Sequence, residues 1–196
     1  MENLAAHNEF FHVRVIVGIV TGLAVARLLS ALGRAVKPVG QNRRDWLQLC
    51  WTVFLFLYVV HFWWFEYGLS RTTSWHFAAY AFVIAYAALL YFVSAVLLPE
   101  GAGTPPSPGQ SYVIEIRYWF FSLIVLMFVF DIIDSAIKGR NYFWGLGLEY
   151  QVRQLAMIVF AFAAIFIRSI WYQGAFIVTA LLSQVFLIVS VYRNLG

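Results

Sequence analysis

Six long apolar runs, separated by short polar segments, dominate the chain. Each run is long enough to cross about 30 Å of hydrocarbon as a helix, because a helix rises about 1.5 Å per residue. The runs cover residues 14–32, 46–67, 75–98, 118–137, 150–170 and 175–192. The pattern therefore predicts an all-α fold, a polytopic transmembrane bundle of about six helices.

Composition supports a single integral membrane domain over residues 1–196. Hydrophobic residues make up 63% of the chain and charged residues 11%, whereas a soluble domain carries about 25% charged residues. We expect a short N-terminal segment at 1–12 and a flexible loop at 99–111, which is rich in proline and glycine. The first apolar run is too long for the core of a signal peptide, so we expect it to remain as the first span.

Both ends of the chain are expected on the same side of the membrane, because the predicted number of spans is even. We call the side that carries the N-terminus side A and the opposite side side B. The first side-B loop holds a basic cluster of Arg34, Lys37, Arg43 and Arg44. The positive-inside rule favours side B as cytoplasmic and both termini as external. These basic residues suit contact with anionic lipid, and we expect no nucleic-acid partner.

Asp131 and Asp134 are the most informative polar residues. They stand three positions apart, so they share one face of the predicted fourth span. Counted from Tyr118 on side B, they lie about 20 and 24 Å into the helix. An unpaired carboxylate at this depth is costly, so both should be paired, protonated or in contact with water.

Other polar side chains should lie near these aspartates on side A, according to the direction of each predicted helix; they are His61, Glu66, His76, Arg153 and Gln154. A cavity lined by Asp131, His61 and Arg153 would suit a proton or ion pathway. A structural ion pair between Arg153 and Asp131 or Asp134 is the competing interpretation. The sequence leaves both open.

Arg27 lies inside the first predicted span, about 10 Å along the helix from Arg34. Its side chain can extend along its own aliphatic part toward side B. It can instead face the bundle and pair with Gln184 or a carboxylate, in which case it joins the candidate pathway.

Small residues recur every four positions on the first predicted span: Gly18, Gly22, Ala26 and Ser30. Such a stripe allows a second helix to approach closely. We expect it to pack against another helix of the same chain, with homodimerisation as the alternative. Besides the lipid bilayer, the expected partners are a second copy of the chain or another membrane protein.

Aromatic residues crowd the side-A end of the second span, where Tyr58 precedes the run from Phe62 to Phe65. Aromatic side chains gather at the membrane–water interface, so the cluster predicts an interfacial belt.

Metal and haem sites have little support in the sequence. His61 and His76 are the candidates, because they lie near one membrane face on consecutive predicted helices. Cys50 is the only cysteine of the chain, which excludes an internal disulfide and a cysteine-based metal site. Asp131 and Asp134 lack the further aspartate that follows in the metal-binding motifs of membrane lipid-phosphate transferases. We expect no cofactor and no metal, and we assign no catalytic residue.

The chain also resembles a loose group of small polytopic bacterial membrane proteins. The resemblance rests on Trp51, on His61-Phe62-Trp63-Trp64 and on Leu98-Pro99-Glu100. It implies a multi-pass protein of the bacterial inner membrane and implies no mechanism.

The leading functional hypothesis is a small ion or proton channel or transporter, with Asp131 and Asp134 in the pathway. One alternative is a non-catalytic subunit or assembly factor of a membrane complex. Another is a membrane-embedded haem or metal protein or an enzyme.

Overall fold

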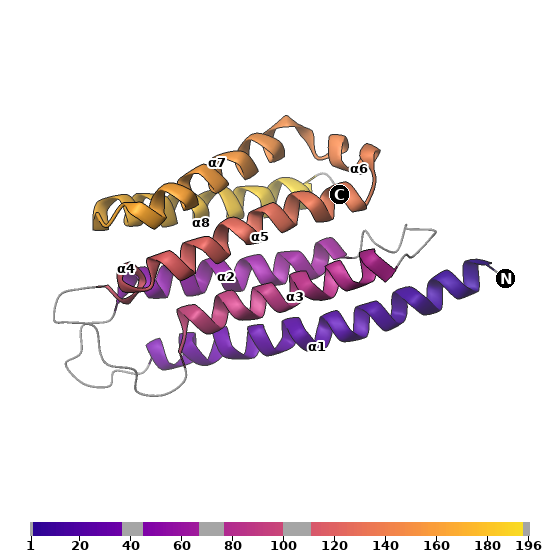
Figure 1. Cartoon of the computed structure of the whole chain (residues 1–196), viewed down its shortest axis with the longest axis horizontal. Helices are drawn as coiled ribbons and strands as arrows, with labels where there is room; N and C mark the ends of the chain where they lie inside the picture. The colour runs from indigo at the N-terminus through magenta and orange to yellow at the C-terminus, as the bar shows by residue number, and fades with distance from the viewer. Residues whose placement is uncertain (1, 37–44, 67–76, 100–110, 194–196) are drawn as a thin grey trace.

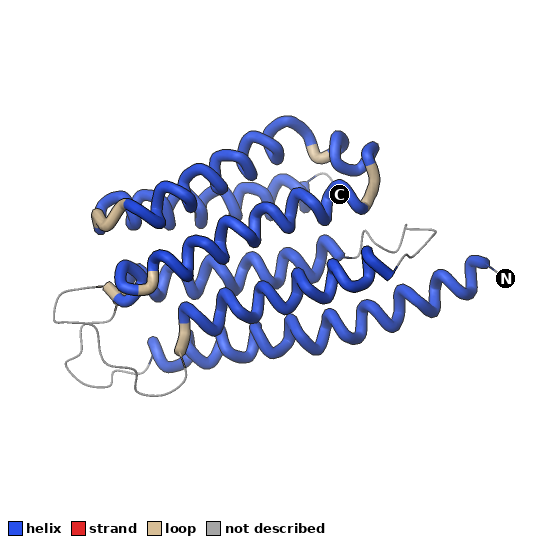
Figure 2. The backbone as a smooth tube through the Cα atoms, viewed as in Figure 1, coloured by secondary structure: helices blue, strands red, loops and turns tan. Residues whose placement is uncertain are grey.

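Helices make up almost all of the protein that the computed structural model describes, namely residues 2–36, 45–66, 77–99 and 111–193 (Figure 2). In chain order they are α1 (Glu2–Val36), α2 (Trp46–Phe65), α3 (Phe77–Leu97), α4 (Tyr112–Glu115), α5 (Arg117–Ile137), α6 (Arg140–Gly145), α7 (Gly147–Phe166) and α8 (Ile170–Arg193). Six of them are long and apolar enough to cross a membrane: α2, α3, α5, α7, Arg14–Val36 of α1 and Ile170–Val189 of α8. The predicted all-α, multi-pass fold is confirmed.

The spanning helices form a closed ring (Figure 1). Around the ring, α1 packs on α3, α3 on α5, α5 on α7, α7 on α8, α8 on α2, and α2 on α1. The start of α1 and the end of α8 lie at the same end of the bundle, which is side A (Figure 1).

Aromatic side chains fill the middle of this ring. The ring of Trp51 lies edge-on to Phe54, Phe120, Phe121 and Phe176, with centroid separations of 5.1 to 5.5 Å. These residues come from α2, α5 and α8 and are almost completely buried. Lipid is as apolar as the side chains, so close packing and aromatic geometry hold such helices together.

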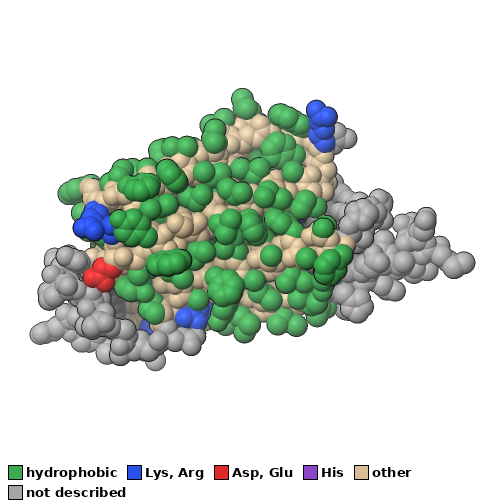
Figure 3. All heavy atoms as spheres, viewed as in Figure 1, with side chains coloured by type: hydrophobic (Ala, Val, Ile, Leu, Met, Phe, Trp, Pro, Cys, Tyr) green, Lys and Arg blue, Asp and Glu red, His purple; other side chains and the backbone are tan. Residues whose placement is uncertain are grey.

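The outer surface is apolar along the length of the bundle. Large side chains such as Ile19, Leu23, Trp119, Phe162 and Phe186 are exposed. Figure 3 shows hydrophobic side chains over the middle of the visible face and charged side chains toward the ends of the helices. An exterior of this kind is stable only in lipid, so the chain is an integral membrane protein.

The small-residue stripe of α1 does not form the packing face we expected. Gly22, Ala26 and Ser30 are exposed, and a side chain at Gly22 would meet nothing within 4 Å. Gly18 is the half-buried member of the stripe, with the indole nitrogen of Trp63 3.9 Å from where its Cβ would stand. The buried face of α1 lies to one side of the stripe and consists of Val17, Thr21, Ala24 and Leu28. Homodimerisation through the stripe stays a prediction.

The turn between the last two spans lies at residues 167–169, and the predicted break at 171–174 was wrong. The side chain of Gln173 explains the difference. Its Nε2 donates hydrogen bonds to the carbonyl oxygens of Ala164 at 3.1 Å and Ile167 at 2.8 Å, which satisfies the end of α7 from within α8. Gly174, which lay in the predicted break, instead belongs to α8 and lies beside the indole of Trp46.

Asp45 fastens two helix starts together on side B. Its Oδ1 accepts hydrogen bonds from the backbone N–H groups of Leu47 at 3.1 Å and Gln48 at 3.3 Å, which caps α2. Its Oδ2 accepts from the Ser111 hydroxyl and the Tyr112 N–H, both at 2.7 Å, at the start of α4. One carboxylate therefore links α2 to the segment that leads into α5.

Replacement of Asp45 with alanine should lower the free energy of unfolding by about 2 kcal/mol, because a helix loses its cap and further donors lose their acceptor. Thermal unfolding in detergent measures the effect. Glu115→Ala is the matched control, since Glu115 is an exposed carboxylate at the same end of the bundle. Equal unfolding temperatures for the two variants would contradict this role of Asp45.

Candidate functional site

Asp131 lies within the membrane span of α5 and is surrounded by hydrogen-bond donors from three other helices. Its Oδ1 accepts from the hydroxyls of Tyr58 on α2 and Tyr86 on α3, each at 3.1 Å. Its Oδ2 accepts from the hydroxyl of Tyr150 at 2.5 Å and from the amide nitrogen of Gln154, both on α7. Hydrogen bonds from protein thus replace the water that a carboxylate would otherwise need.

The tyrosine hydroxyls extend this network on both sides of the carboxylate. The hydroxyls of Tyr58 and Tyr86 lie 2.9 Å apart, and that of Tyr150 lies 2.8 Å from the hydroxyl of Ser135. Each tyrosine hydroxyl has a single proton, so when Tyr58 and Tyr86 are bonded to each other, one donates to its neighbour and the other donates to Asp131. The result is one continuous chain of hydrogen bonds through Asp131.

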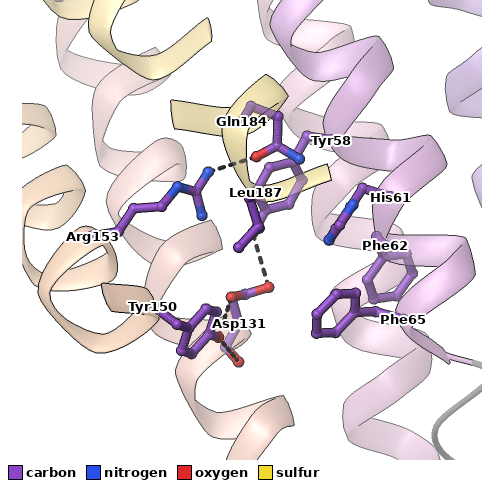
Figure 4. A pocket seen from close by; sticks show the side chains of 9 residues that line it. All are labelled: Tyr58, His61, Phe62, Phe65, Asp131, Tyr150, Arg153, Gln184 and Leu187. Carbon is purple, nitrogen blue, oxygen red and sulfur yellow. Dashed lines mark hydrogen bonds between the residues drawn. The ribbon is translucent and has the colours of Figure 1, made fainter. Parts of the chain in front are cut away.

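A small cavity of about 10 Å³ opens beside Asp131 (Figure 4). Its polar lining consists of Tyr58, His61, Asp131, Tyr150, Arg153 and Gln184. Such a volume holds about one water molecule. The structure therefore brings Asp131, His61 and Arg153 together around one cavity, as their common depth in the sequence suggested.

Arg153 contacts neutral groups of α8. Its Nη2 donates to Gln184 Oε1 at 2.6 Å, and its Nε donates to the hydroxyl of Ser183 at 3.3 Å (Figure 4). Among the described residues it forms no ion pair with Asp131 or Asp134. The alternative of a structural ion pair between Arg153 and an aspartate was wrong. Tyrosines and Gln154 donate hydrogen bonds to Asp131, and Lys138 pairs with Asp134.

A second ionic cluster lies one turn farther toward side A. Lys138, at the end of α5, places its Nζ 3.0 Å from Glu66 Oε1 and 2.5 Å from Asp134 Oδ2. All three side chains are buried, that of Lys138 to 1% exposure. Glu66 Oε2 and Asp134 Oδ1 have no hydrogen-bond partner among the described residues. Two carboxylates thus share one ammonium group.

The sharing of Lys138 changes how the groups outside the span titrate. Burial, followed by the negative charge of Asp134, raises the pKa of Glu66 from 4.5 to about 8. Burial acts to lower the pKa of Lys138, but Asp134 and Glu66 outweigh it and raise that pKa above its usual value. Lys138 therefore stays charged, while Glu66 holds its proton more tightly than an ordinary glutamate does.

Arg27 lies apart from both clusters. Its Nε and Nη2 donate to the carbonyl oxygen of Leu98, at 3.1 and 2.5 Å, where α3 ends on side B. The guanidinium also lies 6.0 Å from the centre of the Tyr91 ring. A cation at the C-terminal end of a helix is favourable, so Arg27 stabilises the end of α3. It does not pair with Gln184, which is bound by Arg153.

The candidate metal ligands do not come together in the described part of the chain. His76 lies outside the described residues, and His61 stacks against Phe65 with ring centroids 4.7 Å apart. Within residues 2–36, 45–66, 77–99 and 111–193, no group of three His, Cys, Asp or Glu is arranged to hold a metal ion.

Sequence reasoning missed the tyrosines and Lys138. Tyr58 was assigned to an interfacial belt but is buried against Asp131, whereas Trp63 is 46% exposed. Nothing in the sequence separates Tyr58, Tyr86 and Tyr150 from the other tyrosines. Lys138 did leave a signal, since it follows Asp134 by four positions, the spacing of an ion pair on one helix face.

The titration of Glu66 predicts how stability depends on pH. The folded state holds the Glu66 proton more tightly than the unfolded chain, so this stabilisation is complete below about pH 4.5 and is lost as the pH rises through about 8. Glu66→Gln should therefore lose less thermal stability than the wild type between pH 5 and pH 9. Unfolding temperatures in detergent test this, with Glu115→Gln as a control that should keep the wild-type slope. A wild-type slope in Glu66→Gln would contradict the assignment.

Comparisons of the chain with protein-family models, curated proteins and solved structures found no match. The resemblance to small bacterial membrane proteins therefore stays a prediction, and the function has to be argued from the polar side chains inside the bundle. The chain is a multi-pass membrane protein of six apolar helices, with a half-buried carboxylate beside a small cavity in the side-A half of the bundle.

Proposed function

We propose that the protein moves protons across the membrane, as a small channel or proton-coupled transporter, and that Asp131 carries the proton. The observation that supports this most directly is the cavity beside Asp131, which His61 and Arg153 also line. Ionisable side chains within a membrane span are costly, and they usually mark a pathway for protons or ions.

The hydrogen-bond network offers a means of moving the proton. Tyr58 and Tyr86 are bonded to each other and to one oxygen of Asp131, while Tyr150 links the other oxygen to Ser135. Each hydroxyl can accept one proton while it donates another. A proton on Asp131 therefore has hydrogen-bonded groups to either side.

The ionic cluster extends the proposed route toward side A. Asp134 lies one helical turn beyond Asp131, and Lys138 joins it to Glu66. The pKa of Glu66, about 8, suits a group that takes up and releases protons near neutral pH. Glu66 and Asp134 would thus exchange protons between the side-A surface and Asp131.

The size of the cavity limits what can pass. Pockets for organic ligands commonly measure about 300 to 1,000 Å³, whereas the cavity measures about 10 Å³. A proton, a water molecule or a single small ion fits this volume. Transport of an organic substrate through this site is not supported.

A structural role in a larger membrane complex is the second candidate function. It is favoured by the hydrogen bonds of Asp131 itself, because the carboxylate joins α5 to α2, α3 and α7. Under this alternative the network holds the bundle together and no proton moves.

Proton flux into liposomes that contain the purified protein tests the proposal. A potassium gradient with valinomycin supplies the voltage, and an internal pH-sensitive dye reports the flux. Asp131→Asn should reduce the flux to the level of protein-free liposomes, because an amide keeps the shape of the carboxyl group but cannot carry the proton. Glu115→Gln, which removes an exposed carboxylate, should leave the flux unchanged.

Flux that persists in Asp131→Asn would overturn the role of Asp131. If the wild-type protein carries no flux under any gradient, and a partner co-purifies in fixed proportion in mild detergent, the structural alternative is correct instead.

A further inference from the structure

Hydrogen-bond donors without acceptors gather on one side of the cavity. Gln184 is 1% exposed, and its Nε2 has no hydrogen-bond partner among the described residues. The buried Nε2 of His61, which is a donor in one of the two neutral tautomers of the ring, also has no hydrogen-bond partner among the described residues. Both residues line the cavity with Arg153, and Figure 4 shows the three side chains around the same space. A buried donor without an acceptor is costly, so this arrangement is suited to a ligand that accepts hydrogen bonds.

The charges around the cavity point to an anion. Arg153 donates its two hydrogen bonds within the described part of the chain to the neutral groups of Gln184 and Ser183. The titratable and charged groups that face the cavity or Asp131 are Tyr58 and His61 from α2, Tyr86 from α3, Asp131 from α5, and Tyr150 and Arg153 from α7. Among them, only Asp131 supplies a carboxylate to balance Arg153.

This balance depends on the proton that Asp131 is proposed to carry. With Asp131 ionised, the two charges at the cavity cancel. When Asp131 takes up a proton, the cavity keeps the positive charge of Arg153 within the membrane, where an uncompensated charge is costly. An anion that enters at this moment restores neutrality and accepts the unused hydrogen bonds of Gln184 and His61.

We propose that the cavity binds a small monatomic anion, chloride or fluoride, between Arg153, Gln184 and His61 when Asp131 carries a proton. The proposal rests on the proposed proton transport and makes it a coupled movement of one proton with one halide ion. The volume of about 10 Å³ favours an ion close to water in size. Larger anions such as sulfate or gluconate do not fit. Guanidinium and amide N–H groups are the donors that anions commonly take in proteins.

Chloride binding to the detergent-solubilised protein tests the site directly, through the line width of the ³⁵Cl nuclear magnetic resonance signal. Asp131→Asn, which has no negative charge at this position, should bind chloride about tenfold more tightly than the wild type, a typical strength for coupling between two sites. The effect of Asp131→Asn is distinctive, because the same variant should carry no proton flux.

Arg153→Gln should abolish chloride binding, whereas Arg168→Gln, which removes an exposed arginine, should bind as the wild type does. Gln184→Glu provides a second variant if Arg153→Gln fails to fold, since a carboxylate at this position repels the anion. Binding that is unchanged in Gln184→Glu, or absent from both the wild type and Asp131→Asn, would overturn the anion site. A water molecule would then be the occupant.

Flux measurements separate this inference from the proposed function. Proton flux through the wild type should require chloride or fluoride and should cease when gluconate is the sole anion. Flux of equal size in gluconate would leave Asp131 as the proton carrier and would overturn the anion inference alone. Chloride binding without proton flux in any buffer would overturn the proposed proton transport and, with it, the coupled movement.

Discussion

Lipid offers no hydrogen bonds, and this constraint governs how the bundle treats Asp131. The carboxylate lies within the span of α5, so its acceptors must be satisfied by protein. Tyrosines 58, 86 and 150 and Gln154 supply the donors, and they come from α2, α3 and α7. Satisfying one side chain therefore fixes how four helices face one another. The same contacts place the carboxylate beside a cavity, where its charge is available for function.

The backbone groups at the helix ends, which lie closer to the membrane surfaces, also need hydrogen-bond partners that lipid cannot supply. Asp45 caps α2 and binds the start of α4, Arg27 binds the carbonyl of Leu98 just past the end of α3, and Gln173 binds carbonyls at the end of α7. Each is a polar side chain whose partner is a backbone group that the helix itself leaves unpaired. The hydrogen bonds to helix ends therefore explain why Asp45, Arg27 and Gln173 stand at these positions. Two nitrogens beside Asp131, the Nε2 atoms of Gln184 and His61, lack such an explanation, because they have no hydrogen-bond partner among the described residues.

Two clusters of charged side chains thus lie in the side-A half of the bundle, and they pair positive with negative charge in different ways. In one, Lys138 binds both Asp134 and Glu66. The burial of Glu66, followed by the negative charge of Asp134, raises the pKa of Glu66. In the other, Asp131 and Arg153 line one cavity and each binds neutral partners. A change of one proton alters the net charge of either centre inside a poorly solvated interior, where such a change is energetically large. This sensitivity is the physical basis of the proton movement that we propose.

The sequence by itself determined the six spans and the depth of their polar residues. Span length is a local property, so apolar runs predict it, and helix counting placed Asp131, His61 and Arg153 at one level. Only the tertiary structure decided which faces meet. In the folded bundle the small residues of α1 face outward, tyrosines donate hydrogen bonds to Asp131, and Arg153 donates a hydrogen bond to Gln184. The physical reason is that these helices are apolar on nearly every side. Hydropathy therefore cannot separate a face that meets lipid from one that meets another helix.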